Sequence, residues 1–290
     1  MKLAVFVFLT LSTVVTSAQV VFEDMILVEK GKTRFYLDIF EMNCGKANEL
    51  AAKKGTVYCP FGTEIIWKPS RMDFDSAKAA CEQQGKRLPT EAEWLMAGSR
   101  YGKNKNYTLR EDRLQDSSGT YIPNIMGKGG QSLPTTDFAK IGIDAIGTVG
   151  MTGNRAEWVI GANGRSMQCG GQYESTNLAE LQLSTTCSST RVAASATARC
   201  VAEVKADTQV VYSSYVSGEL LNYIESMSKT KNLPMILIQE NQFTKEKNYE
   251  LRIKFYPFTD VPLPAPPEEP IVSDETAEEP QEAIDVPSPL

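Results

Sequence analysis

The stretch KRLPTEAEW, residues 86–94, predicts the start of a helix. Thr90 and Glu93 have the Thr-x-x-Glu spacing of a capping box, in which each side chain accepts a hydrogen bond from the other residue's backbone N–H. Such a cap stabilises a helix by about 1 kcal/mol. Pro89 precedes the cap, and Trp94 follows in the first turn, where it can pack against the entering chain. The stretch is thus explained as a structural element, without any contact to a substrate.

A second predicted helix lies just before this one, in MDFDSAKAACEQQGK (72–86). Asp73 is a favourable N-cap residue, and Gly85 is placed as the C′ residue that ends the helix. The rest of the body, residues 19–203, contains short apolar runs and many loops. We therefore predict an α+β domain with little regular structure.

Residues 204–258 predict a smaller α+β unit. In SGELLNYIESMSK (217–229) the apolar residues recur at the three-to-four spacing of a helix. PMILIQ (234–239) has the composition of a buried strand, and KNYELRIKFY (247–256) alternates apolar and polar residues. The two strands can form a hairpin. The unit contains no chemical motif, so we expect it to serve packing or homo-oligomerisation.

The first residues, 1–18, have the pattern of a secretory signal peptide. Lys2 precedes an apolar run from Leu3 to Leu11, and small residues follow, so we expect cleavage before Gln19. The run is too short to cross a membrane, and no other stretch of the chain is long and apolar enough. We therefore expect an exported protein, periplasmic, secreted or at the cell surface, without a membrane span.

The last residues, 259–290, form a tail rich in proline and glutamate. From residue 261 onward there are eight prolines and eight Asp or Glu residues, but no Lys, Arg or aromatic residue. Such a segment cannot bury enough apolar surface to order itself, so we predict a disordered spacer. Without its eight negative charges the net charge of −6 becomes +2. The body is near neutral, and no basic run suggests nucleic-acid binding.

The chain has no histidine and six cysteines. The absence of histidine excludes Ser-His-Asp and Cys-His catalysis as well as histidine-ligated zinc. Carboxylate, thiol, lysine, tyrosine and oxygen-ligated metal chemistry remain possible. Because the cysteine count is even and we predict export, we expect the cysteines to form disulfides.

Four blocks of the chain resemble, in the same order, the sulfatase-modifying-factor domain of formylglycine-generating enzymes, a fold related to C-type lectins. They are FYLDIFEMN (35–43), FDSAKAACEQQGKRLPTEAEWLMAG (74–98), DAIGTVGMTGNRAEWV (144–159), and CGG with TARC (169–171 and 197–200). RLPTEAEW is the most specific of the motifs. The later blocks depart from the family at Arg155-Ala156, which replace an apolar residue and Trp, and at Gln172-Tyr173, which replace Ser-Trp. The resemblance implies this fold for residues 19–203.

The resemblance implies one disulfide, between the helix cysteine Cys81 and the closing-strand cysteine Cys200. Closing so long a loop stabilises a fold by roughly 4–5 kcal/mol in the chain-entropy model. Cys44 and Cys59 lie close in sequence, which favours a local bridge between them. The remaining pair is then Cys169 with Cys187.

The resemblance also bears on the family's chemistry. Formylglycine-generating enzymes hold copper(I) between two cysteines spaced Cys-x-x-x-x-Cys, because soft thiolates suit that ion. In the matching stretch CSSTRV (187–192), Cys187 fits the first position, but Val192 occupies the second. The related iron-dependent sulfoxide synthases use histidine ligands, which this chain lacks. We therefore expect no catalysis and no copper site.

Calcium is the metal that the resemblance does imply. The family binds calcium around a G-N-x-x-E motif with backbone carbonyls and the glutamate, which are hard oxygen ligands. The residues that match this site are Gly153, Asn154, Arg155 and Glu157. Those that resemble a second family site are Asn124, Ile125 and Asp137. Alternatively, Asn154 and Glu157 only hold the loop by hydrogen bonds, and Arg155 neutralises Glu157.

We expect an exported, non-catalytic domain that binds a protein or glycan ligand. Irregular loops on a disulfide-stapled scaffold suit recognition, and related domains bind through the region before the closing strand, here about 172–197. The candidate ligand-binding residues are Tyr173, Glu174, Asn177 and Arg191. Two alternatives remain: a copper- and thiol-dependent oxidase that uses Cys187 with Cys169, and a structural, oligomeric surface component assembled through residues 204–258.

Overall fold

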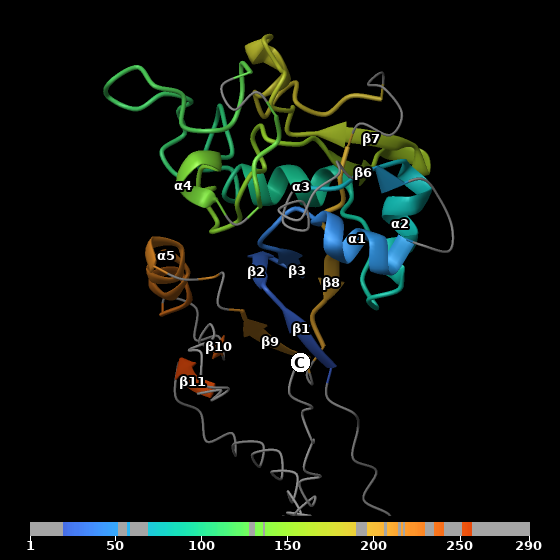
Figure 1. Ribbon diagram of the computed structural model, residues 1–290, viewed down its shortest axis with the longest axis vertical. Helices are drawn as coiled ribbons and strands as arrows, with labels where there is room; N and C mark the ends of the chain where they lie inside the picture. Colours follow the sequence, from blue (N-terminus) through green and yellow to red (C-terminus); the bar gives the residue numbers. More distant parts are fainter. Residues whose placement is uncertain are drawn as a thin grey trace, which may run out of the picture. The chain divides into compact units, whose positions relative to one another are not determined.

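The fold is known from a computed structural model (Figure 1). It describes residues 20–51, 57–58, 69–127, 131–135, 137–189, 196–205, 208–213, 216, 218–229, 235–240 and 251–256. The predicted signal peptide and the predicted acidic tail lie outside these ranges. Within them, no helix combines the length and the apolar character that a membrane span requires.

An antiparallel three-stranded sheet lies at the centre of the body, in the order β2–β3–β8. Strands β2 (Met25–Lys30) and β3 (Thr33–Asp38) form a hairpin in which Val28 lies opposite Phe35. Strand β8 (Val201–Glu203) comes from much later in the chain and pairs with β3. The closing segment of the body is therefore hydrogen-bonded to its first hairpin.

Helix α2 (Phe74–Glu82) begins and ends at the predicted caps. The Asp73 carboxylate accepts a hydrogen bond from Ser76 N at 2.7 Å. At the other end Gly85 has a φ of 68°, and Lys86 N donates to Cys81 O at 3.0 Å. This bond, five residues back, closes a Schellman motif with Gly85 at C′. Glycine is needed there because the left-handed conformation strains other residues.

Helix α3 (Glu91–Gly98) begins with the predicted capping box. Glu93 N donates to Thr90 Oγ1 at 3.2 Å, and Thr90 N donates to the Glu93 carboxylate at 2.8 Å. The two basic residues of KRLPTEAEW are also structural. Arg87 forms two hydrogen bonds with Glu93, and Lys86 forms an ion pair with Asp38 at 2.6 Å.

The other elements of the body are short, and turns connect them. They are α1 (Cys44–Ala51), β4 (Val57–Tyr58), β5 (Arg71–Met72), α4 (Phe138–Ile141), β6 (Glu157–Ile160), η2 (Ala162–Gly164), β7 (Ser166–Cys169) and η3 (Leu178–Glu180). Strands β6 and β7 pair antiparallel, with Glu157 opposite Cys169. The body therefore mixes helices and strands with little regular structure.

The two tryptophans of the sequence motifs are both buried, but they lie in different clusters of the core. Trp94 packs with Phe35, Leu37 and Val159, whereas Trp158 packs with Met72 and other residues around α2. The reason is the alternation of side chains along β6, which sends Trp158 to one face of the strand and its neighbours to the other. Trp158 is fixed there by its indole N–H, which donates to Met72 O at 2.8 Å.

The C-terminal elements form a second sheet with the N-terminal strand, in the order β1–β9–β10–β11. Its strands are β1 (Val20–Glu23), β9 (Thr208–Tyr212), β10 (Met235–Glu240) and β11 (Leu251–Tyr256). Strands β10 and β11 pair antiparallel, in the two segments for which the sequence predicts strands. Strand β9 pairs with β1 and also with β10, in both cases in parallel. Sequence spacing gave no sign of the β1–β9 pairing, because the two strands are far apart in the chain.

Helix α5 (Gly218–Lys229) confirms the predicted amphipathic helix. Its buried residues Leu220 and Ile224 belong to the same core cluster as Trp94. Tyr223 donates from its hydroxyl to Ala145 O at 2.8 Å. The sequence separated residues 204–258 from the body, whereas in the structure contacts cross that boundary because the apolar face of α5 packs against the body.

Candidate functional site

A buried ion pair joins the G-N-x-x-E segment to the closing segment of the body. The side chains of Glu157 and Arg199 are both fully buried, and Arg199 Nε and Nη2 lie 2.8 Å and 2.6 Å from Glu157 Oε1. Glu157 Oε2 accepts a hydrogen bond from the Trp94 indole N–H at 2.6 Å. The RLPTEAEW tryptophan and the TARC arginine therefore share one carboxylate.

The remaining donors of Arg199 are satisfied by the backbone. Nη1 donates to the carbonyl oxygens of Asp38 and Ile39 at 2.9 Å and 2.5 Å, and Nη2 donates to Val149 O at 2.7 Å. A buried guanidinium is stable only when its charge and its N–H groups all find partners. Arg199 meets this condition, so it is a structural residue that connects three segments of the chain.

Glu41 is a second buried carboxylate near this ion pair, with 2% of its surface exposed. It accepts hydrogen bonds from Asn154 Nδ2 at 2.5 Å and from Arg155 N at 2.9 Å. Burial, followed by the negative charge of Glu157, raises the pKa of Glu41 well above its usual value. Asn154, with a φ of 52°, is thus fixed by Glu41 and carries the turn that leads to Glu157.

Asp144 is the third buried carboxylate of the body. It accepts hydrogen bonds from Thr108 Oγ1 at 2.5 Å, from Thr148 Oγ1 at 3.1 Å and from Met151 N at 3.0 Å. Burial raises the pKa of Asp144 from 3.8 to about 6. Its partners belong to the loops between α3 and β6, so Asp144 organises a region that has little regular structure.

Arg155 lies beside Glu41 and Asn154, but its side chain points to different partners. Its Nη2 donates to Ser132 Oγ at 3.2 Å, and its guanidinium carbon lies 5.2 Å from the centre of the Tyr173 ring. Only 6% of the residue is exposed. It does not neutralise Glu157, which was one of the alternatives above, because Arg199 has that role.

The predicted ligand-binding residues lie in the turns after β7. The Tyr173 hydroxyl donates to the Glu174 carboxylate at 2.6 Å, and Glu174 is exposed. Asn177 caps η3 by accepting a hydrogen bond from Ala179 N at 3.1 Å. Ser175, which the sequence analysis missed, donates to Glu180 at 2.8 Å and braces this loop. Arg191 lies outside the described residues, as does Val192.

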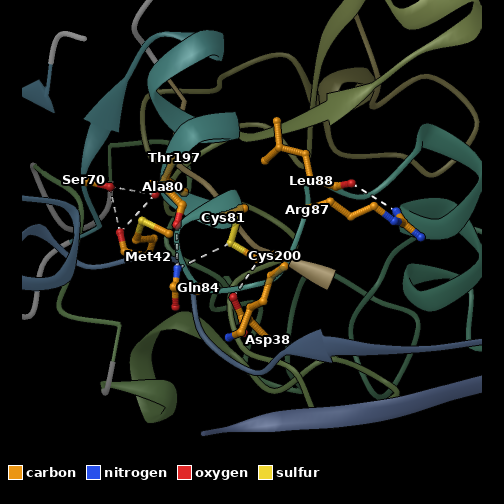
Figure 2. The surroundings of a disulfide bond; sticks show 11 residues. Asp38, Met42, Ser70, Ala80, Cys81, Gln84, Arg87, Leu88, Thr197 and Cys200 are labelled. Carbon is orange, nitrogen blue, oxygen red and sulfur yellow. Dashed lines mark hydrogen bonds and ion pairs between the residues drawn. A yellow bond between two sulfur atoms is a disulfide. The ribbon is translucent and has the colours of Figure 1, made fainter. Parts of the chain in front are cut away.

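Two disulfides are described in the body, and both agree with the expected pairing. Cys81 and Cys200 are joined across 119 residues of sequence, with Cα atoms 5.6 Å apart. Figure 2 shows this bridge between α2 and the closing segment, where the Asp38 carboxylate accepts a hydrogen bond from Cys200 N at 2.9 Å. Cys169 and Cys187 form the second bridge. Cys44 is also disulfide-bonded, and its predicted partner Cys59 lies outside the described residues.

The residues around Glu157 do not fit a calcium ion. Both oxygens of this carboxylate are already held, one by the positive guanidinium of Arg199 and the other by the Trp94 N–H. A calcium ion would have to displace the buried arginine or lie against it, and repulsion between the two cations opposes this. Within the described ranges, no group of three acidic or cysteine side chains is arranged for a metal.

The second predicted calcium set is different. Asn124 is buried, and its Oδ1 has no hydrogen-bond partner among the described residues. An amide oxygen of this kind is a suitable calcium ligand. Ile125 is buried beside it, and Asp137 is partly exposed and forms an ion pair with Lys140 at 2.9 Å. Calcium at Asn124 and Asp137 therefore stays a prediction, supported by one amide oxygen, Asn124 Oδ1, that has no partner among the described residues.

Comparison with known proteins agrees with this arrangement. Residues 69–204 match the model of the Sulfatase-modifying factor enzyme 1-like domain. A comparison with curated proteins gave no match. The matched range contains the helix pair α2–α3, the Glu157–Arg199 ion pair and both described disulfides, whereas FYLDIFEMN (35–43) precedes it. Residues 69–204 thus form a sulfatase-modifying-factor-like domain, which confirms the resemblance.

Proposed function

We propose that this sulfatase-modifying-factor-like domain is an exported, non-catalytic module that binds a ligand through the loops after β7. The observation that carries the proposal is the disulfide between Cys169 and Cys187. Copper(I) needs two thiolates in this family, and a disulfide offers neither. Among the described residues no cysteine is free, so none of them supplies a thiolate for oxygen activation.

The oxidase alternative would require a change in this bridge. Cys187 would have to be reduced and to find a second sulfur, because the sequence offers Val192 at the family's partner position. Cys169, to which Cys187 is bonded, is fully buried. It also lies on β7 directly opposite Glu157, at the centre of the domain. These contacts favour a structural role for the Cys169–Cys187 bridge.

A binding role is supported by how the loops are held. The turn from Gly170 to Ser175 is braced by Thr186 Oγ1, which accepts from Gly170 N at 2.7 Å, and by Ser175 Oγ, which accepts from Gln172 N at 3.0 Å. Such bracing lowers the entropy that a loop loses when it binds a partner. The polar side chains of Tyr173 and Glu174 are then presented on a stable base, as recognition surfaces require.

Export is proposed on the sequence of residues 1–18 and on the disulfides. Disulfides persist in oxidising compartments, and the Cys81–Cys200 bridge lies in the core of the domain, where both residues are fully buried. The protein is expressed with residues 1–18 in a host that has a secretion pathway, and N-terminal sequencing of the product tests whether the chain is exported and cleaved. A mature chain that begins at Gln19 supports export, and an uncleaved chain recovered from the cytoplasm contradicts it.

The catalytic question is tested with a peptide that carries the cysteine motif of a sulfatase. The purified protein is incubated with this peptide, copper(I), oxygen and a mild reductant, and formylglycine is followed by mass spectrometry. We expect no product. Formation of formylglycine by the wild type, and its loss in both Cys187→Ser and Cys169→Ser, would establish the oxidase instead. Thiol titration of the native protein then tests whether any cysteine is free, and we expect no reactive thiol.

A further inference from the structure

Arg155 is a buried cation that has no ion-pair partner among the described residues. It is 94% buried. Its Nε has no hydrogen-bond partner within the same ranges. Buried arginines are normally paired, because a desolvated charge is costly when it is left alone. The buried Arg199 is different, because Glu157 and backbone carbonyl oxygens accept the hydrogen bonds of its guanidinium. We regard that role as structural.

Glu41 does not form an ion pair with the guanidinium of Arg155. Glu41 is committed to Asn154 Nδ2 and to the backbone N–H of Arg155, at 2.5 Å and 2.9 Å. Burial is the largest cause that lowers the pKa of Arg155, and it outweighs the negative charge of Glu41, which acts in the opposite direction and is followed by the positive charge of Arg71. Glu41 therefore offsets the charge of Arg155 only in part, and no described carboxylate forms an ion pair with the guanidinium.

Tyr173 covers one face of this guanidinium, and Ser132 holds one edge of it. The ring centre lies 5.2 Å from the guanidinium carbon, which is cation–π distance, and Ser132 Oγ accepts from Nη2. None of the described residues accepts a hydrogen bond from Nη1. The arginine is thus fixed in one orientation with a donor left for an incoming group.

We propose that Arg155, framed by Tyr173 and Ser132, is the binding site for a carboxylate side chain of an acidic peptide or protein ligand. The inference rests on the proposed binding function and names its ligand class. A carboxylate matches the planar N–H edge of arginine, and the desolvated setting strengthens the pair. A protein ligand is favoured because tyrosine and arginine are the residues that concentrate at the centres of protein interfaces.

The test measures binding of an acetylated hexaglutamate peptide by isothermal titration calorimetry at low salt. The variant is Arg155→Gln, with Arg165→Gln as the matched control, because Arg165 carries the same charge and is exposed. We expect Arg155→Gln to weaken binding about 10- to 100-fold, the effect of losing one charge-assisted hydrogen bond, and the control to bind like the wild type. A hexaglutamine peptide should not bind.

Equal binding of hexaglutamate by the wild type and Arg155→Gln overturns the proposal. Binding of glucuronate or sulfate at this arginine, without binding of the peptide, also overturns it and indicates a sugar acid or an inorganic anion. If Arg155→Gln does not fold, the Nε–H resonance of Arg155 is followed by NMR in the wild type, where the peptide should shift it. An absent shift refutes the proposal. A result against Arg155 leaves the catalytic test above unaffected, so the two failures are distinguishable.

Discussion

Replacing Arg199 by Met should leave Glu157 buried, charged and without its counter-ion. Removal of one partner from a buried ion pair costs about 3–5 kcal/mol. The carbonyl oxygens of Asp38, Ile39 and Val149 also lose the hydrogen bonds from Arg199, although Ile39 O keeps the one from Val149 N. A buried carbonyl left without a donor costs about 1 kcal/mol or more. We therefore expect a loss of at least about 5 kcal/mol, which equals the whole unfolding free energy of many domains.

The assay is urea unfolding at neutral pH, followed by tryptophan fluorescence. Three variants are compared: Arg199→Met, Glu157→Gln, and the double substitution. The double variant should be more stable than Arg199→Met, because the buried charge is gone and a neutral amide can keep the hydrogen bond from Trp94. The coupling between the two positions should therefore be large and favourable. Arg165→Met, at an exposed position, should change stability by less than about 0.5 kcal/mol.

Two results would refute this account. A double variant that is no more stable than Arg199→Met would show that the uncompensated charge is not the cause of the loss. The other result is a stabilisation of the wild type by calcium against urea that Glu157→Gln abolishes and Asn124→Ala does not. In that case Glu157 holds a metal ion, and Arg199 is not its counter-ion in solution.

Three further outcomes are expected. The pKa of Asp144 is raised from 3.8 to about 6, so its contribution to stability is complete below pH 3.8 and is lost as pH rises through about 6. For Asp144 this decline amounts to up to about 3 kcal/mol between pH 4 and pH 8. Asp144→Asn should remove that part of the pH dependence and leave the part due to Glu41 and Asp24, whose pKa values burial also raises. Replacing Cys81 and Cys200 together by Ser should lower the unfolding free energy by about 4–5 kcal/mol, since the bridge closes a loop of 119 residues. A loss below about 1 kcal/mol would contradict the chain-entropy estimate. Trp94→Ala should cost about 3–5 kcal/mol in the same assay, and the smaller Trp94→Phe change should mainly remove the hydrogen bond to Glu157.

The local features of the fold could be predicted from the sequence, because each depends on residues a few positions apart. The capping box of Thr90 and Glu93 and the left-handed Gly85 follow from turn and cap chemistry alone. The hairpin strands β10 and β11 follow from alternation and composition. The family resemblance added the Cys81–Cys200 bridge, which joins positions too distant for any local rule.

The buried charges could not be predicted in the same way. Glu157 carries a motif, and we interpreted it as a metal ligand. The sequence marks Arg199 only as part of the TARC stretch. Its spacing from Glu157 gave no indication that Arg199 would neutralise the Glu157 carboxylate. Glu41 and Asp144 are common residues in ordinary contexts, and their roles depend on loops that fold around them. The contact of Arg155 with Tyr173 is also long-range, although both positions had been noted as departures from the family.

The position of Arg199 late in the chain has a consequence for biogenesis. A ribosome produces Glu41, Asp144 and Glu157 well before it produces Arg199, and Cys81 well before Cys200. Until the closing segment emerges, the carboxylates lack the cation that stabilises their burial, and the helix cysteine lacks its partner. The nascent body therefore cannot complete its core or close the Cys81–Cys200 bridge before the closing segment is made. If the chain is exported as we propose, both steps would follow translocation.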